Sequence, residues 1–265
     1  MKLFFSFLCM GLLWSGCGPE ATGPKPLVVG MELAYPPFEM TDEQGEPTGV
    51  SVDMAKALSE YIGRPLEIRN MSFDGLIPAL KTGSIDVIIS SMTATEERAN
   101  SIDFSDPYLH TELSLLTSKG SGVESVTDLN QEGRMVVVKL GTTGHVYSKA
   151  NLDKATLRVL EKENACVMEV VQGKADAFLF DQLSVYQNAK RHPETTKAIL
   201  ASFQRESWAV GIRQGNDELT EQVNAFLSEF REQGGFEALG EKYLGDFQRG
   251  FKELGIPFVF DPPAP

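Results

Sequence analysis

Four short apolar runs of this sequence are each followed directly by side chains that can bind a small polar molecule. They are Glu32, Tyr35 and Phe38 after the first run, Ser91 and Thr93 after the second, Lys139, Thr142 and Thr143 after the third, and Asp181 after the fourth. The set combines opposite charges, hydroxyl groups and aromatic faces. It suits recognition of a charged organic molecule through ion pairs, hydrogen bonds and cation–π contacts.

Arg98 follows the second of these groups by a few residues. A guanidinium group is planar and permanently charged, and it can donate two parallel hydrogen bonds to one carboxylate. By itself Arg98 indicates only an anion site. The alternative is an ion pair with Glu97 or Asp103 on a helix surface, and for Asp181 the alternative is a helix cap.

Other residue types give no sign of catalysis. Cys166 lies beside Val167 and Met168, which favours a small buried side chain, and its spacing to His145 suggests no nucleophile and base. The segment 141–144 lacks the Gly-Lys-Ser/Thr ending of a phosphate-binding loop. We therefore expect no catalytic residue, no metal and no cofactor.

The four apolar runs, at 27–30, 86–90, 135–138 and 176–180, alternate with helical patterns at 51–62, 74–81 and 164–172. This alternation predicts mainly parallel sheets covered by helices. A helix, a Gly-x-x-Asp segment and an apolar strand occur in this order twice, about 90 residues apart. We expect Asp74 and Asn164 to cap the helices of the two copies, and we expect two similarly built lobes.

The lobes are predicted to be joined by two strands, at 113–117 and 208–212. Lobe one then comprises 27–115 and 208–250, and lobe two comprises 116–207. A helix with an apolar stripe from Leu219 to Phe230 and a second one ending near Tyr243 belong to lobe one, and 251–265 form a tail of no predicted function. Because ligands of open parallel sheets bind at the carboxyl ends of strands, the polar groups should meet between the lobes.

The N-terminus predicts export. Lys2 and an apolar run to Trp14, too short to span a bilayer, precede Ser15-Gly16-Cys17. This pattern resembles a signal peptide, residues 1–17, with a lipobox in which Cys17 carries the lipid, although Trp14 stands where leucine is usual. The alternative is an ordinary signal peptide with an incidental cysteine. Residues 18–26 read as a tether, and we expect a periplasmic or cell-surface protein anchored to the membrane by its lipid.

Composition narrows the partners further. The 265 residues carry a formal net charge of −13, which argues against nucleic acid and against an anionic membrane surface as binding partners. Of the three cysteines, only Cys166 lies beyond the predicted leader and lipid site, so no internal disulfide is expected. We expect a monomer.

The stretch 90–108, together with Tyr-Pro-Pro-Phe-Glu at 35–39 and Asp-Gly-Leu-Ile-Pro-Ala-Leu-Lys-Thr-Gly at 74–83, resembles the family-3 periplasmic solute-binding proteins. These are the amino-acid receptors of ABC importers, and the resemblance runs from about Leu27 to Gly245. It implies the type II periplasmic-binding-protein fold, an α/β fold with two lobes and a two-strand hinge. It also implies that the lobes close on the ligand and that the closed form docks on an ABC permease in the inner membrane.

The resemblance implies roles for particular residues. Arg98 would bind the α-carboxylate of an amino acid and Asp181 its α-ammonium. Ser91 and Thr93 would add contacts beside Arg98. Thr142 and Thr143 would begin a helix whose free N–H groups face an anion.

The ligand's side chain is less narrowly implied. Tyr35 and Phe73 match an aromatic pair that encloses basic or glutamine side chains in relatives, and Glu32 matches an acid at the far end. Lys139 argues against a basic ligand if it enters the pocket, because it would repel a cation or neutralise Glu32. A basic amino acid such as arginine or lysine is favoured, with glutamine next. A cyclohexadienyl dehydratase, or an amino-acid sensor without a transporter, is the alternative function.

Overall fold

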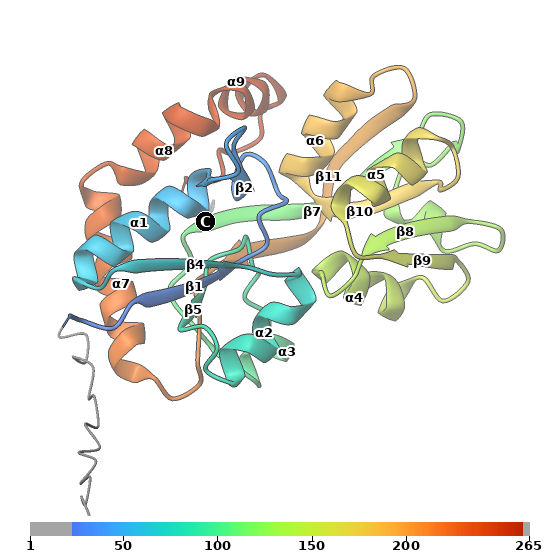
Figure 1. The fold of residues 1–265 in the computed structure, drawn as a ribbon. Helices are drawn as coiled ribbons and strands as arrows, with labels where there is room; N and C mark the ends of the chain where they lie inside the picture. The colour runs from blue at the N-terminus through green and yellow to red at the C-terminus, as the bar shows by residue number, and fades with distance from the viewer. Residues whose placement is uncertain (1–22, 262–265) are drawn as a thin grey trace, which may run out of the picture.

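The structure, a computed structural model, describes residues 23–261. It consists of two α/β lobes connected by two long strands, β7 (Leu109–Ser118) and β11 (Thr196–Trp208) (Figure 1). The predicted signal peptide with Cys17, and most of the predicted tether, lie outside the described residues. Within 23–261 no helix combines the length and the apolar character needed to cross a bilayer.

The sheet of lobe one has the strand order β4-β1-β5-β12-β6. Three of its strands are mutually parallel, namely β4 (Leu66–Asn70), β1 (Leu27–Met31) and β5 (Val87–Ile88). The chain that returns from lobe two adds β12 (Gly211–Ile212), which pairs in antiparallel fashion with β5 and with the edge strand β6 (Asp103–Phe104). A small hairpin, β2 (Met40–Thr41) and β3 (Pro47–Thr48), lies beside this sheet.

Lobe one contains most of the helices. They are α1 (Val50–Ile62), α2 (Phe73–Lys81), α3 (Glu96–Ala99), α7 (Asp217–Glu232), α8 (Gly235–Tyr243) and α9 (Gly245–Leu254). The predicted apolar stripe of α7 is buried from Leu219 through Val223 to Leu227. Burial of this stripe against the other helices and the sheet supplies the main driving force for the lobe's fold.

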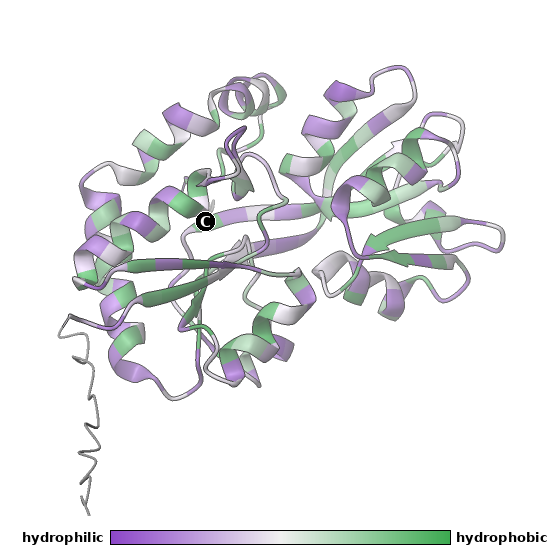
Figure 2. Cartoon of the chain, in the orientation of Figure 1, coloured by the Kyte–Doolittle hydropathy of each residue, from purple (hydrophilic) through white to green (hydrophobic). Residues whose placement is uncertain are grey.

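Lobe two has the strand order β11-β7-β10-β8-β9. Its parallel strands are β10 (Ala177–Asp181), β8 (Met135–Lys139) and β9 (Thr156–Leu160), and its helices are η1 (Val126–Leu129), α4 (Thr143–Asn151), α5 (Glu163–Val171) and α6 (Gln182–Arg191). Val136, Val137 and Val138 are all fully buried because helices cover both faces of this sheet. Figure 2 shows the same contrast, with hydrophobic strands inside and hydrophilic helix faces outside.

Two predicted helix caps are each wrong by two residues. Ser72 precedes α2 and Lys162 precedes α5. Asp74 and Asn164 therefore lie in the first turns of these helices. A carboxylate in a first turn is still favourable, because it faces the positive end of the helix dipole.

The second connecting strand lies earlier in the chain than predicted. β11 ends at Trp208, and its residues 204–208 pair with β7 from Leu113 back to Leu109. The predicted strand at 208–212 is instead where the chain re-enters lobe one through β12. Sequence patterns missed β11 because its second half is mostly polar, Ser-Phe-Gln-Arg-Glu-Ser. Pairing with β7, rather than an apolar run, makes this segment a strand.

The C-terminal segment belongs to lobe one. α9 continues past the predicted start of the tail at 251, and Phe251, Val259 and Phe260 are buried in the lobe-one core. The carbonyl of Val259 accepts a hydrogen bond of 2.9 Å from the N–H of His110 on β7. Residues 251–261, the described part of the expected tail, therefore pack in lobe one beside one of the connecting strands.

α9 also contacts lobe two. The Tyr186 ring of α6 lies 5.5 Å from the Phe251 ring and 6.0 Å from the Phe247 ring, between centroids. Gly250 lies directly beneath its hydroxyl group, so that a Cβ at position 250 would be 1.8 Å from the Tyr186 oxygen. Close approach of α6 and α9 therefore requires glycine at this position.

We expect Gly250→Ala to lower the free energy of unfolding by about 1–3 kcal/mol, the usual cost of overpacking. Gly245→Ala, in the same helix, is the control, because its Cβ would meet only the flexible end of Arg249 at 3.6 Å. Denaturant unfolding of both variants measures the difference. In a Tyr186→Ala background the effect of Gly250→Ala should disappear, and persistence of the full effect there would contradict the contact.

Glu39 is a buried acid that joins the start of α1 to the loop after β5. Its carboxylate accepts hydrogen bonds from the hydroxyls of Ser51 at 2.6 Å and Ser91 at 3.1 Å, and its exposed fraction is 1%. Burial raises the pKa of Glu39 to about 8, although both hydroxyls and the charge of Lys139 act to lower it. The protonated form is thus favoured in the folded protein.

A raised carboxyl pKa in the folded state makes stability fall as the pH rises from the unfolded value, about 4.5, through about 8. We expect Glu39→Gln to flatten this part of the dependence of melting temperature on pH and to raise the melting temperature at pH 8. Glu43→Gln, at an exposed loop position, should leave the wild-type slope unchanged. If Glu39→Gln leaves the slope of melting temperature against pH unchanged, the raised pKa of Glu39 does not govern this pH dependence.

Candidate functional site

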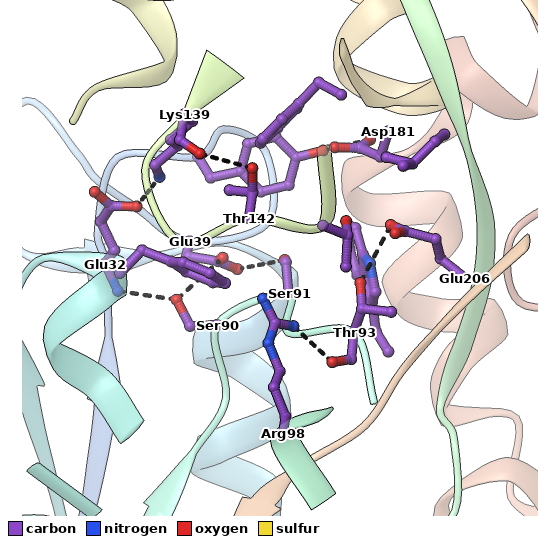
Figure 3. A pocket seen from close by; sticks show the side chains of 16 residues that line it. Glu32, Glu39, Ser90, Ser91, Thr93, Arg98, Lys139, Thr142, Asp181 and Glu206 are labelled. Carbon is purple, nitrogen blue, oxygen red and sulfur yellow. Dashed lines mark hydrogen bonds and ion pairs between the residues drawn. The ribbon is translucent and has the colours of Figure 1, made fainter. Parts of the chain in front are cut away.

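A small cavity of about 40 Å³ lies between the lobes at the carboxyl ends of the parallel strands. Every predicted principal binding residue lines it, and so does Lys139: Glu32, Tyr35, Phe73, Ser91, Thr93, Arg98, Thr142, Thr143 and Asp181. The close view in Figure 3 shows Glu32 and Lys139 at the left of the cavity, Asp181 and Glu206 at the right, and Arg98 below. A wider cleft of about 780 Å³ adjoins it and shares Phe73, Arg98 and Thr143.

Phe38, predicted as a further lining residue, does not line the cavity. It is fully buried in lobe one, with its ring stacked on Tyr35 at a centroid distance of 5.4 Å and edge-on to Trp208 at 5.1 Å. The turn through Pro36 and Pro37 directs Tyr35 into the cavity and Phe38 into the core behind it. Phe38 therefore supports the Tyr35 ring from behind.

Arg98 connects the two lobes. It belongs to the short helix α3, whose first turn is capped by Thr95. Its guanidinium group donates to the Thr93 carbonyl of lobe one at 2.6 Å and to the Gly141 carbonyl of lobe two at 3.0 Å. Burial lowers the pKa of Arg98, and the nearby Glu206 carboxylate opposes this effect. Among residues 23–261 it forms no ion pair, so the surface pair considered from sequence is not present.

The N-terminus of α4 faces Arg98 from the other lobe. The Thr142 hydroxyl caps this helix by accepting from the N–H of His145, and it donates to the Lys139 carbonyl at 2.8 Å. Within the described part of the chain, the N–H groups of Thr143 and Gly144 have no acceptor. Free N–H groups at a helix start, opposite a guanidinium, form a site suited to a carboxylate.

Asp181 caps a helix and also lines the cavity. Its Oδ1 caps α6 by accepting from the N–H groups of Leu183 at 3.0 Å and Ser184 at 3.1 Å, and it also accepts from the Tyr35 hydroxyl at 2.7 Å. Its Oδ2 has no partner within residues 23–261. Burial raises the pKa of Asp181 to about 6. A capping oxygen fixes the carboxylate while the other oxygen stays free to bind a cation.

The loop after β5 is held in an unusual conformation. Ser91 has a φ of 50°, in the left-handed region that few non-glycine residues adopt. Its hydroxyl donates to Glu39, which thereby holds the loop in this conformation beside the cavity. Its oxygen keeps lone pairs for a ligand, so the predicted contact from the Ser91 hydroxyl is limited to acceptance.

At the end of the cavity opposite Asp181 and Glu206, an ion pair joins the two lobes (Figure 3). The Lys139 ammonium bonds to the Glu32 carboxylate, and their side chains are only 6% and 13% exposed. The same ammonium lies 5.3 Å from the centre of the Phe73 ring, and the Arg98 guanidinium lies 5.5 Å from it. Lys139 thus enters the cavity and neutralises Glu32, one of the two outcomes considered from sequence.

Several residues that line the cavity were not among the predicted binding residues: Glu39, Ser90, Leu113, Phe180, Glu206 and Trp208. Glu39 ends the Tyr-Pro-Pro-Phe-Glu motif and could have been found there. Glu206 belongs to the polar half of β11, which was not recognised as a strand. Its spacing of two from Trp208, on the same face of an extended chain, is the one signal that could have identified it.

The profile of the bacterial extracellular solute-binding proteins, family 3, matches residues 27–246. The L-cystine-binding protein TcyJ of Escherichia coli is 30% identical over 83% of this chain and 82% of its own length. The L-arginine-binding protein of Pseudomonas aeruginosa is 31% identical over 85% of this chain and 90% of its own length.

Solved structures agree with this match. The ancestral amino-acid-binding protein AncCDT-1, a precursor of cyclohexadienyl dehydratase, is 36% identical with a TM-score of 0.76, over 82% of this chain and 95% of its own. An ancestral arginine-binding protein bound to arginine is 34% identical with a TM-score of 0.77, over 83% of this chain and 98% of its own. The chain belongs to the bacterial extracellular solute-binding proteins of family 3.

Proposed function

We propose that this protein binds a polar L-α-amino acid between its lobes and presents it to an ABC permease. The arrangement of Arg98 and the α4 N-terminus at one place, and the free Oδ2 of Asp181 at another, supports this proposal most strongly. A zwitterion has one carboxylate and one ammonium, and both must be paired when water is removed. The cavity offers a partner for each.

Closure of the lobes would complete the site. Arg98 and Tyr35 lie in lobe one, whereas the α4 N-terminus and Asp181 lie in lobe two. A ligand that contacts both sets lowers the free energy of the closed arrangement and can shift the lobes toward it. β7 and β11 connect the lobes, and we propose that bending at these strands accompanies closure.

For the ligand's side chain, we propose a neutral polar group. Lys139 already pairs with Glu32, so a basic side chain would have to displace one buried cation with another. A carboxamide, which both donates and accepts hydrogen bonds, can bond to both members of the pair. A second zwitterionic end, as in cystine, can do so too. Neutral polar side chains are thus placed ahead of basic ones, which reverses the preference that the sequence suggested.

Three further properties are proposed from sequence: export, a lipid on Cys17 and a monomeric state. We also propose that the protein binds its ligand without transforming it.

The relationship to a precursor of cyclohexadienyl dehydratase favours a second candidate function. Asp181 and Glu206 have raised pKa values in the cavity and could serve a dehydratase as acids. Binding accounts for Asp181 without such a step.

Arg98→Ala should weaken binding of L-glutamine, L-cystine or L-arginine, whichever binds the wild type, by about 100-fold or more. A charge-assisted pair with the carboxylate is lost and the ligand's charge is left unpaired. Isothermal titration calorimetry measures the affinity. Arg249→Ala, at a side chain 72% exposed on α9, is the control and should bind as the wild type does. Unchanged affinity in Arg98→Ala would rule out this carboxylate site.

Lys139→Met should move the preference toward basic ligands. Loss of the ammonium leaves Glu32 free to pair with a cationic side chain, so we expect the ratio of L-arginine to L-glutamine affinity to rise by about 10-fold or more. Lys149→Met, which removes an exposed lysine from the same lobe, is the control. The wild type could bind L-arginine more tightly than L-glutamine, and Lys139→Met could lower the ratio of L-arginine to L-glutamine affinity. This pair of results would show that the ligand's side chain is not the proposed neutral polar group.

A further inference from the structure

Glu206 lies between the two lobes. It is part of β11, near where this strand passes from lobe two into lobe one, and it is 5% exposed. Its carboxylate accepts from the Thr93 hydroxyl of lobe one at 3.2 Å, and the Thr143 hydroxyl of lobe two lies close enough to lower its pKa. The side-chain amide of Gln204 donates to the other carboxylate oxygen of Glu206 at 3.4 Å. Glu206 therefore contacts both walls of the cavity from the strand that connects them.

The structure gives this carboxylate no ionic partner. Within residues 23–261 it forms no salt bridge, since the Arg98 guanidinium donates instead to the Thr93 and Gly141 carbonyls. Burial raises the pKa of Glu206, and repulsion by Asp181 raises it further, although the Thr143 and Thr93 hydroxyls and the nearby Arg98 charge act to lower it. Two carboxylates thus lie on one side of a buried cavity (Figure 3). Such a pair is costly without a cation and is relieved when a cation lies close to both.

We propose that Glu206 is a second carboxylate for the ligand's α-ammonium group, acting together with Asp181, and that the pair selects for a primary ammonium. The inference rests on the proposed function. A primary ammonium has three N–H donors, so it can bond to two carboxylates and still to a hydroxyl. A methyl group on this nitrogen would remove one donor, and an α-hydroxy acid would remove the charge.

The same contacts suggest one competing role. Glu206 could stand in for the ligand's carboxylate, because Thr93, Thr143 and Arg98 surround it. Two observations favour the ammonium role instead. Arg98 makes no hydrogen bond to Glu206, and the N–H groups of Thr143 and Gly144 have no acceptor in the described chain. The site suited to a carboxylate is therefore distinct from the position that Glu206 occupies.

Glu206→Gln distinguishes the two roles. Glutamine has the same shape, so the fold is kept, and loss of an unpaired buried charge should raise the ligand-free melting temperature. Calorimetric titration with L-glutamine, L-arginine and L-cystine, and with the Nα-methyl derivative of each one that binds, gives the affinities. We expect about 10-fold or greater loss of affinity for the parent amino acid, with a smaller loss for the Nα-methyl derivative.

Glu97→Gln is the matched control, because Glu97 is exposed and adjoins Arg98 without lining this cavity. It should leave the affinity and the preference for the primary ammonium unchanged. Unchanged affinity in Glu206→Gln would overturn the inference, and tighter binding would assign Glu206 the competing role. If Arg98→Ala abolishes binding while Glu206→Gln does not weaken it, only this inference fails. If Arg98→Ala binds normally, the proposed function fails.

Discussion

The cavity depends on one electrostatic constraint, which is that a charge removed from water must find a partner. Three contacts between the lobes satisfy it in part. Lys139 pairs with Glu32, Arg98 bonds to the Gly141 carbonyl, and the Tyr35 hydroxyl bonds to Asp181. They leave one oxygen of Asp181 and the first N–H groups of α4 unused. The proposed zwitterion would use these groups as partners for its ammonium and its carboxylate.

The lobes contribute to the cavity in different ways. Lobe two presents the N-termini of two helices, α4 and α6, each of which follows a strand of its sheet. Backbone N–H groups and a capping Asp181 are therefore fixed by secondary structure itself. Lobe one presents side chains mainly from loops and from the short helix α3, and these need support. Glu39 holds the Ser91 loop, Phe38 lies behind Tyr35, and the Thr93 carbonyl orients Arg98.

Specificity is divided between the two ends of the cavity. At one end, Arg98, Asp181 and Glu206 surround the place proposed for the groups that all amino acids share. At the other end, Lys139 and Glu32 form a neutral but polar surface beside Phe73. An amino acid would be recognised as such at the first end and distinguished from other amino acids at the second. Substitutions at the second end could thus change the ligand without changing the fold.

Local sequence determined the helices and apolar strands, because hydrophobic periodicity and glycine stops act within a few residues. The motifs also identified Arg98 and Asp181, which the structure brings to one cavity. β11 was not predicted from the sequence, because its pairing with the remote segment β7 makes it a strand despite its polar residues. Phe38 was misplaced because the direction of a side chain after two prolines depends on the core that receives it. Only the tertiary structure decided that Lys139 neutralises Glu32, 107 residues away, and that Glu206 enters the cavity. Both outcomes depend on how closely the lobes approach, and no single stretch of sequence carries that information.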